Sequence, residues 1–130
     1  MLSVFMRKIE SILRSHHLSG ILRIPEIMTR SSSIELRHLL EKVVEEAGLT
    51  PLSCAAFDFE PQGASVVLLL KESHIAIHVW PELCKMTVDI HVCDFSDDNL
   101  ERAQLLAKLL TFSDNFPENI NQWNLQTVSG

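Results

Sequence analysis

Cysteine is scarce in this sequence. Cys54, Cys84 and Cys93 are the three cysteines, and no two of them have CxxC spacing. An odd number of cysteines without that spacing argues against a disulfide framework and against a cysteine-rich zinc site. We therefore expect a protein of a reducing compartment, the cytoplasm.

Basic residues and long apolar runs are scarce as well. The chain has 11 Lys and Arg against 17 Asp and Glu, a formal net charge of −6 and a pI near 5.4. Nucleic-acid binding needs clustered basic side chains, so nucleic acid is not expected as a partner. No stretch approaches the roughly 18 consecutive apolar residues of a membrane span, so no membrane partner is expected.

What the chain does contain suits a single globular domain. It has 130 residues, of which 46% are hydrophobic and 22% charged. We expect the domain to cover residues 20–130. Residues 1–19 are expected to be an N-terminal extension, helical or disordered, because they have apolar residues at helical spacing but no signal-peptide apolar run. An organelle-targeting or partner-binding helix is the alternative for this extension.

The apolar pattern predicts strands and two helices in a defined order. Strands are expected over 20–27, 52–60, 65–71, 74–80 and 86–93, and the tail can add an edge strand. Helices are expected over 34–47, with a capping box at Ser32 and Glu35, and from about 96–98 to 110. Short turns favour an antiparallel sheet, so the predicted fold is α+β, a two-layer sandwich with both helices on one face.

Alternation in the last two central strands predicts two different faces. The residues expected under the helices are Ile75, Ile77, Val79, Val88, Ile90 and Val92. The residues on the opposite face are His74, His78, Trp80, Thr87, Asp89, His91 and Cys93. This second face is too polar for a core, yet it carries a tryptophan and has no predicted helix over it. A ligand site, a second subunit or both could cover it. The apolar strand 65–71 is instead predicted to be buried on both faces.

The segment KESHIAIHVWPE, residues 71–82, holds two histidines that invite a metal-site interpretation. His74 and His78 are four residues apart, but on a strand that spacing separates them by about 13 Å, which is too far for one ion. No metal is therefore expected. Cys93 and His78 could form a thiol–imidazole pair, although that signal is weak on its own.

The same segment contains a serine directly after a turn. No GxSxG motif is present, so a serine hydrolase of that class is not indicated. Ser73 could instead turn its hydroxyl toward the carbonyl of Glu72, and nearby polar groups could promote attack on its own backbone.

Three motifs that follow one another in the chain carry a family resemblance. They are FEPQGAS at 59–65, ESHIAIHVWPE at 72–82 and VDIHVC at 88–93. In order and spacing, over residues 20–112, they resemble the S-adenosylmethionine decarboxylase proenzymes of the short, prokaryotic type. The resemblance implies a lyase that supplies the aminopropyl donor for spermidine biosynthesis.

The resemblance also implies that the chain cleaves itself. Ser73 attacks the Glu72 carbonyl in an N-to-O acyl shift, and Ser65 and His78 match the assisting residues. Cleavage leaves an α-chain, residues 73–130, that begins with a pyruvoyl group made from Ser73. This cofactor condenses with the substrate amine and accepts electrons as CO₂ leaves.

Catalytic and binding roles follow from the same resemblance. Cys93 matches the family's catalytic cysteine, which donates a proton to the decarboxylated carbon, and Ser73 and His78 complete the catalytic set. The substrate-binding positions are Phe59, Trp80 and Glu82. Aromatic faces suit a purine and a sulfonium cation, and a carboxylate suits ribose hydroxyls. Family members dimerise through their sheets, which implies a homodimer that covers the polar face.

Some positions depart from the family pattern. Leu83 and Cys84 stand where the family commonly has Tyr-Gly, and Asp94 stands where it commonly has glycine. These positions flank the expected pocket, so they bear on the substrate. A same-fold decarboxylase of arginine or ornithine is one alternative. A homologue that does not process itself and binds or regulates a partner is another.

Overall fold

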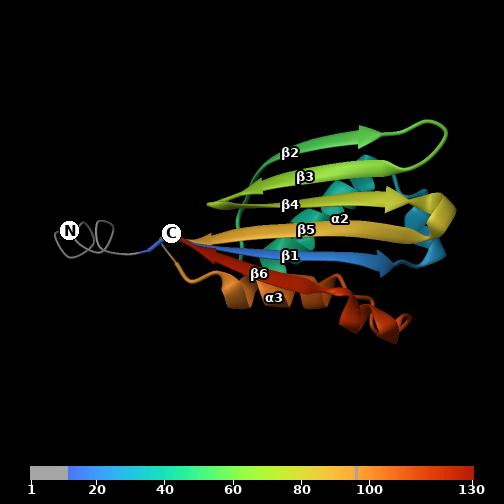
Figure 1. Cartoon of the computed structure of the whole chain (residues 1–130). Coiled ribbons are helices and arrows are strands. Elements are labelled where there is room, and N and C mark those ends of the chain that lie inside the picture. The colour runs from blue at the N-terminus through green and yellow to red at the C-terminus, as the bar shows by residue number, and fades with distance from the viewer. Residues whose placement is uncertain (1–11, 96) are drawn as a thin grey trace.

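The computed structural model describes residues 12–95 and 97–130, which fold into one sheet with two α-helices (Figure 1). The elements in chain order are β1 Arg14–Arg23, η1 Glu26–Arg30, α2 Ser33–Glu46, β2 Pro51–Asp58, β3 Ala64–Leu70, β4 Ser73–Trp80, η2 Pro81–Leu83, β5 Lys85–Asp94, α3 Leu100–Leu109, η3 Pro117–Gln122 and β6 Asn124–Ser129. No helix in this described part is long and apolar enough to cross a membrane.

The strands pair in the order β2-β3-β4-β5-β1-β6, and all five pairings are antiparallel. Helix α2 packs on β2 and β3, and α3 packs on β5 and β1, on the same face of the sheet. The predicted two-layer α+β sandwich is confirmed. We call the sheet face without helices the open face.

The ends of both helices have clear chemical causes. Helix α2 begins with the predicted capping box, in which Ser32 and Glu35 satisfy each other's backbone N–H groups. Gly48, at φ 84°, follows its last turn. Helix α3 begins at Leu100, later than predicted, because the backbone N–H of Asn99 donates to Asp94 and holds the preceding loop out of the helix.

The first strand begins six residues earlier than predicted. Five of the six residues 14–19 are polar, but the segment pairs with β5 from Arg14 opposite Asp94 onward, so it belongs to the sheet and not to the extension. The strand ends at Arg23, before Pro25, which has no N–H for a ladder. Residues 1–11 of the predicted extension lie outside the described residues.

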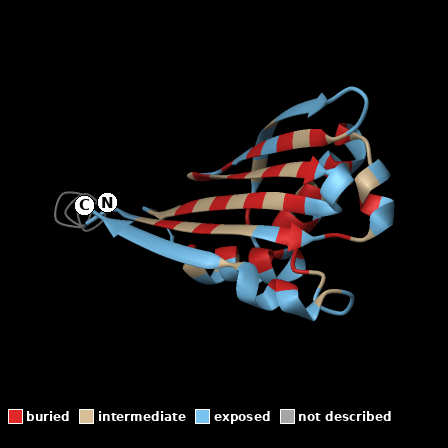
Figure 2. Ribbon diagram, turned by 45° about the vertical axis from the view of Figure 1, so that its right-hand side comes forward, coloured by how far each residue is buried: buried red, intermediate tan, exposed pale blue. Residues whose placement is uncertain are grey.

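Burial alternates along the central strands, as the striped colouring in Figure 2 shows. The six residues predicted to lie under the helices are all buried. The prediction that the third strand is buried on both faces was wrong, because Val67 and Leu69 lie on the open face and are exposed. Neither α2 nor α3 covers that face. The core therefore lies between the sheet and the helices, and the open face carries the polar residues.

Candidate functional site

A strained hairpin joins β3 to β4. Leu70 pairs with Ser73, so the turn between them has two residues, Lys71 and Glu72. Glu72 has φ 61°, in the left-handed region. That conformation costs an ordinary L residue about 1–2 kcal/mol. The bond predicted to be cut therefore follows a strained residue.

Ser73 is the first residue of β4 and lies on the helix side of the strand. Its side chain is buried, and Oγ has no hydrogen-bond partner within the described residues. An unsatisfied buried hydroxyl costs about 1–3 kcal/mol. Such a group is expected where a hydroxyl is kept for chemistry and not for structure.

Cys93 lies beside this hairpin. Its neighbour Val92 pairs with Ser73, and Cys93 itself is on the open face. Burial, followed by the nearby Asp94 and Glu72 carboxylates, raises the pKa of the Cys93 thiol. The sulfur therefore carries its proton at neutral pH. That state suits a proton donor better than a nucleophile.

The second group of predicted residues lies at the other end of the open face. Ser65 and His78 face each other across β3 and β4, and Ser65 Oγ lies 2.6 Å from His78 Nδ1. Both line a pocket of about 290 Å³. The other lining residues are Phe59, Gln62, Gly63, Val79, Trp80, Pro81 and Glu82. The structure therefore brings the three predicted substrate-binding residues to the Ser65–His78 pair.

Two residues with positive φ set the backbone conformation around this pocket. Gly63 has φ 98°, and a Cβ there would lie 3.2 Å from the Val79 carbonyl oxygen, so the turn can approach β4 closely. Cys84 has φ 50°, a left-handed conformation, at the position where the resemblance expects glycine. The turn keeps its form with a different residue.

The two groups do not meet within one chain. His78 follows Ser73 by five residues on the same strand, which is about 17 Å. The weak alternative of a Cys93–His78 pair is wrong for the single chain, because the imidazole in contact with Cys93 is that of His91, with Nε2 3.4 Å from Sγ. We call these groups the hairpin end (Glu72, Ser73, Cys93) and the pocket end (Phe59, Ser65, His78, Trp80, Glu82).

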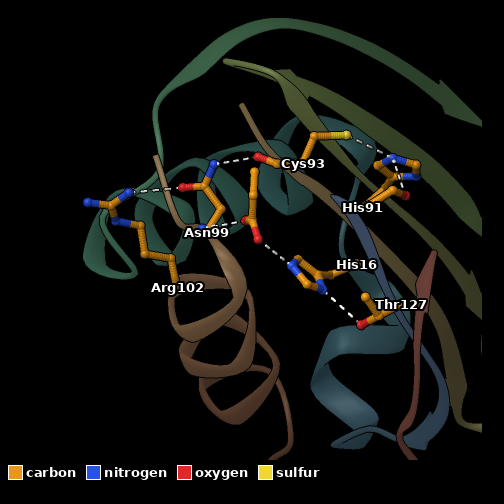
Figure 3. A network of polar contacts seen from close by, with 8 residues as sticks. His16, His91, Cys93, Asn99, Arg102 and Thr127 are labelled. Carbon is orange, nitrogen blue, oxygen red and sulfur yellow. Dashed lines mark hydrogen bonds and ion pairs between the residues drawn. The ribbon is translucent and has the colours of Figure 1, made fainter. Parts of the chain in front are cut away.

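A buried polar network supports the hairpin end and was not predicted (Figure 3). His16 Nε2 lies 2.6 Å from Asp94 Oδ2, and its Nδ1 lies 2.8 Å from Thr127 Oγ1. Asn99 donates its backbone N–H to Asp94 and its side-chain Nδ2 to the Cys93 carbonyl. The network fixes the backbone at Cys93. The replacement of glycine by Asp94 was the sequence signal that could have indicated it.

Two other hollows of the described chain contain none of the predicted site residues, and one of them, of about 420 Å³, lies beside Asp89 and Asn124. No group of three or more His, Cys, Asp or Glu among the described residues is arranged to hold a metal ion. The other of these hollows, of about 380 Å³, lies beside α3 and η3, with an apolar lining that includes Leu18, Ala107 and Trp123. It contains none of the predicted site residues, so we place the candidate site on the open face.

Comparisons with known proteins show the family of this chain. The family model described as S-adenosylmethionine decarboxylase matches residues 23–115. A similar relative, the S-adenosylmethionine decarboxylase proenzyme of Hydrogenobaculum sp. (strain Y04AAS1), is 46% identical over 69 residues, covering 53% of this chain and 50% of the relative. The proenzyme of Carboxydothermus hydrogenoformans is 37% identical over 91 residues, covering 70% and 62%.

A solved structure shows the same architecture. The crystal structure of the adenosylmethionine decarboxylase from Aquifex aeolicus VF5 is 29% identical and superimposes with a TM-score of 0.62, covering 89% of this chain and 88% of that chain. The chain spans about half the length of the first curated relatives that it matches.

Fold and site together define a class: two-layer α+β proteins whose sheet has a strained Glu-Ser hairpin at one end and, at the other end of its open face, a Ser-His pocket. Within that class, the chain belongs to the S-adenosylmethionine decarboxylase family.

Proposed function

We propose that this chain is the precursor of a pyruvoyl-dependent decarboxylase and that it cleaves itself between Glu72 and Ser73. The observation that carries the proposal is the buried Ser73 hydroxyl, which has no hydrogen-bond partner among residues 12–95 and 97–130 and directly follows a left-handed Glu72. Both features destabilise the intact hairpin. Breaking the bond between the two residues releases both costs.

The cleavage balances as an acyl shift followed by an elimination. Ser73 Oγ bonds to the Glu72 carbonyl carbon, the peptide C–N bond breaks, and the freed amine takes the hydroxyl proton. Elimination of the ester then releases the Glu72 carboxylate. Hydrolysis of the remaining enamine expels ammonia and leaves the pyruvoyl group as the first residue of the α-chain.

The pyruvoyl ketone supplies the electron sink for loss of CO₂. The residues around it have complementary tasks. Cys93 is a protonated thiol on the open face and donates the proton that replaces the lost carboxylate. Ser65 and His78, 2.6 Å apart, assist both cleavage and decarboxylation.

The separation of the two ends supports a homodimer through the open face. A two-fold axis that lies between two open faces and crosses the strands reverses the strand direction of one subunit relative to the other. The pocket end of one subunit then covers the hairpin end of the other. This arrangement would bury the exposed Phe57, Val67, Leu69 and Trp80 and form two complete sites.

S-adenosylmethionine is the proposed substrate, and its decarboxylated product is the aminopropyl donor for spermidine biosynthesis. Phe59 and Trp80 offer aromatic faces for the purine and the sulfonium, and the Glu82 carboxylate accepts ribose hydroxyls. Leu83 and Cys84 depart from the family pattern beside the pocket. Arginine and ornithine are therefore the competing candidate substrates. A cytoplasmic location stays a prediction.

Two measurements test this function. On a denaturing gel, the purified chain is expected to run as fragments 1–72 and 73–130, and the Ser73→Ala variant as one intact band. CO₂ release is then compared for S-adenosylmethionine, arginine and ornithine. A folded wild-type chain that stays whole and releases no CO₂ identifies a binding homologue instead and contradicts the proposal.

A further inference from the structure

Three histidines form a row across the open face. His91 on β5 lies opposite His17 on β1 and His74 on β4 in the strand register. The His91 ring stacks on that of His74 with a centroid distance of 4.9 Å and an interplanar angle of 23°, and its centroid is 5.8 Å from that of His17. The His91 ring is therefore held on both sides.

One nitrogen of His91 faces the catalytic thiol. Nε2 lies 3.4 Å from Cys93 Sγ and 3.3 Å from Ser15 Oγ, and Figure 3 shows the imidazole and the thiol directed toward each other. Both side chains leave the same face of β5, two residues apart. This contact was not part of the predicted catalytic set.

The charges around the pair keep both partners neutral at rest. Burial, followed by the neighbouring His74 and His17, lowers the pKa of His91. Burial, followed by Asp94 and Glu72, raises the pKa of Cys93. The Asp89 carboxylate faces the row from β5, 3.0 Å from His17 Nε2. Ser15, the remaining contact of the His91 ring from β1, carries no charge. A neutral imidazole thus lies beside a protonated thiol.

We propose that His91 is a positioning residue that returns a proton to Cys93 after each turnover. This inference rests on the proposed function, in which Cys93 protonates the decarboxylated carbon. It adds a residue and a step that the cleavage and decarboxylation described above do not require.

The proton balance is as follows. When Cys93 protonates the carbon, a C–H bond forms, the S–H bond breaks, and sulfur keeps the electron pair. The thiolate then lies close to Asp94 and Glu72, where a negative charge is unfavourable. Its charge draws a proton from water onto His91, which leaves hydroxide in the solvent, and Nε2–H passes a proton to sulfur. Both groups are neutral again, and water has supplied the proton that replaced the carboxylate.

The row gives this proton a way in from solvent. The side chain of His17 is 45% exposed, while His91 is half-buried between its neighbours. In the single chain, water therefore reaches the His17 end of the row, where the ring centroid lies 5.8 Å from that of His91.

The test is kcat of the processed His91→Ala variant, with and without added imidazole. We expect kcat to fall about 10- to 100-fold. This loss is at or below the lower end of what general acid–base catalysis contributes, because water can also protonate the thiolate. KM should stay within about twofold, since His91 is not in the pocket. Imidazole, which fits the space that the side chain leaves, should restore kcat in a saturable manner. A purely structural role for His91 predicts no such restoration.

Two further variants complete the design. His91→Gln keeps a polar side chain of similar reach, covers the case in which the alanine variant does not fold, and should lose kcat in the same way. The matched control is His38→Ala on the exposed side of α2, which should keep the wild-type kcat. A His91 variant with wild-type kcat, or an alanine variant whose lost kcat imidazole does not restore, overturns the proposal. A wild-type chain that is not cut contradicts the proposed function itself.

Discussion

The hairpin end and the pocket end of the open face differ in what they carry. The hairpin end has the proposed nucleophile Ser73, the proposed proton donor Cys93 and a left-handed Glu72, and a buried polar network fixes its backbone. The pocket end has a hollow of about 290 Å³, two aromatic side chains and a Ser–His pair. One end could carry out the chemistry, and the other could bind a substrate.

From this difference we propose that one chain holds two half-sites. The ends lie on the same strand about 17 Å apart, so bending β4 cannot join them without breaking its pairing with β3 and β5. Two copies related by a two-fold axis join them without any change of fold. The account therefore depends on contact between open faces.

The largest expected effect comes from breaking that contact. Leu69→Glu places a charge at an exposed apolar position of the open face, and burying an unpaired charge costs several kcal/mol. We expect the dissociation constant of the dimer, measured by sedimentation, to rise at least about 100-fold, with most of the chain left uncut. Ile34→Glu, on α2 away from the open face, is the matched control. A Leu69→Glu chain that dimerises and cleaves normally would show that this face is not the interface.

A smaller effect should come from the pocket end alone. Glu82→Gln keeps the shape of the side chain but removes the charge that strengthens hydrogen bonds to ribose hydroxyls, a difference of about 1.5 kcal/mol. We expect KM for S-adenosylmethionine to rise about tenfold, with self-cleavage and kcat unchanged. Glu101→Gln on α3, outside the pocket, serves as the control. If Glu82→Gln blocks cleavage instead, the two ends do not have separate tasks.

The smallest effect should come from the network behind the hairpin end. Burial pushes the pKa of Asp94 up, but hydrogen bonds from Asn99 and His16 outweigh burial and leave the pKa below its ordinary value of 3.8. A lowered folded-state pKa stabilises the protein above about pH 4, and that contribution is lost as pH falls through the folded value. Asp94→Asn should therefore cost about 1 kcal/mol of unfolding free energy at pH 7.

Urea denaturation at pH 7 and at pH 3 measures this change. The difference between wild type and Asp94→Asn should shrink at the lower pH, because protonation removes the same charge that the substitution removes. Asp114→Asn, in an exposed loop, is the control. A difference of equal size at both pH values would mean that the charge of Asp94 contributes nothing.

Much of this comparison could be predicted from sequence. The alternation of Ile75, Ile77 and Val79 with polar residues assigned both faces of β4, and the capping box assigned the start of α2, because these signals are local. Five of the nine residues that line the pocket were also named from the family motifs: Phe59, Ser65, His78, Trp80 and Glu82. Two features join residues that are far apart in sequence, so a local pattern could not predict them. They are the pairing of residues 14–19 with β5 and the contact between His16 and Asp94, which are 78 positions apart.

The exposure of β3 could not be predicted for a related reason. The run 65–71 has apolar residues on both sides of the strand. A strand buried within one chain and a strand at a subunit interface both have this pattern, so the pattern cannot distinguish them. The distance between Ser73 and His78 could have been calculated from the spacing of residues along a strand. The family motif instead assigned both residues to one site. In the structure the two residues lie five positions apart on β4, about 17 Å, and this separation is the basis for the proposal of a site shared by two chains.

The central claim is tested most directly by co-expressing two inactive chains, Ser73→Ala and a tagged His78→Gln. In their mixed dimer, the intact hairpin end of the His78→Gln chain meets the intact pocket end of the Ser73→Ala chain. We predict that neither chain is cut alone and that the tagged His78→Gln chain is cut after residue 72 in the mixture. A tagged chain that stays whole in copurified mixed dimers, or that is cut on its own, would contradict the sharing of sites between subunits.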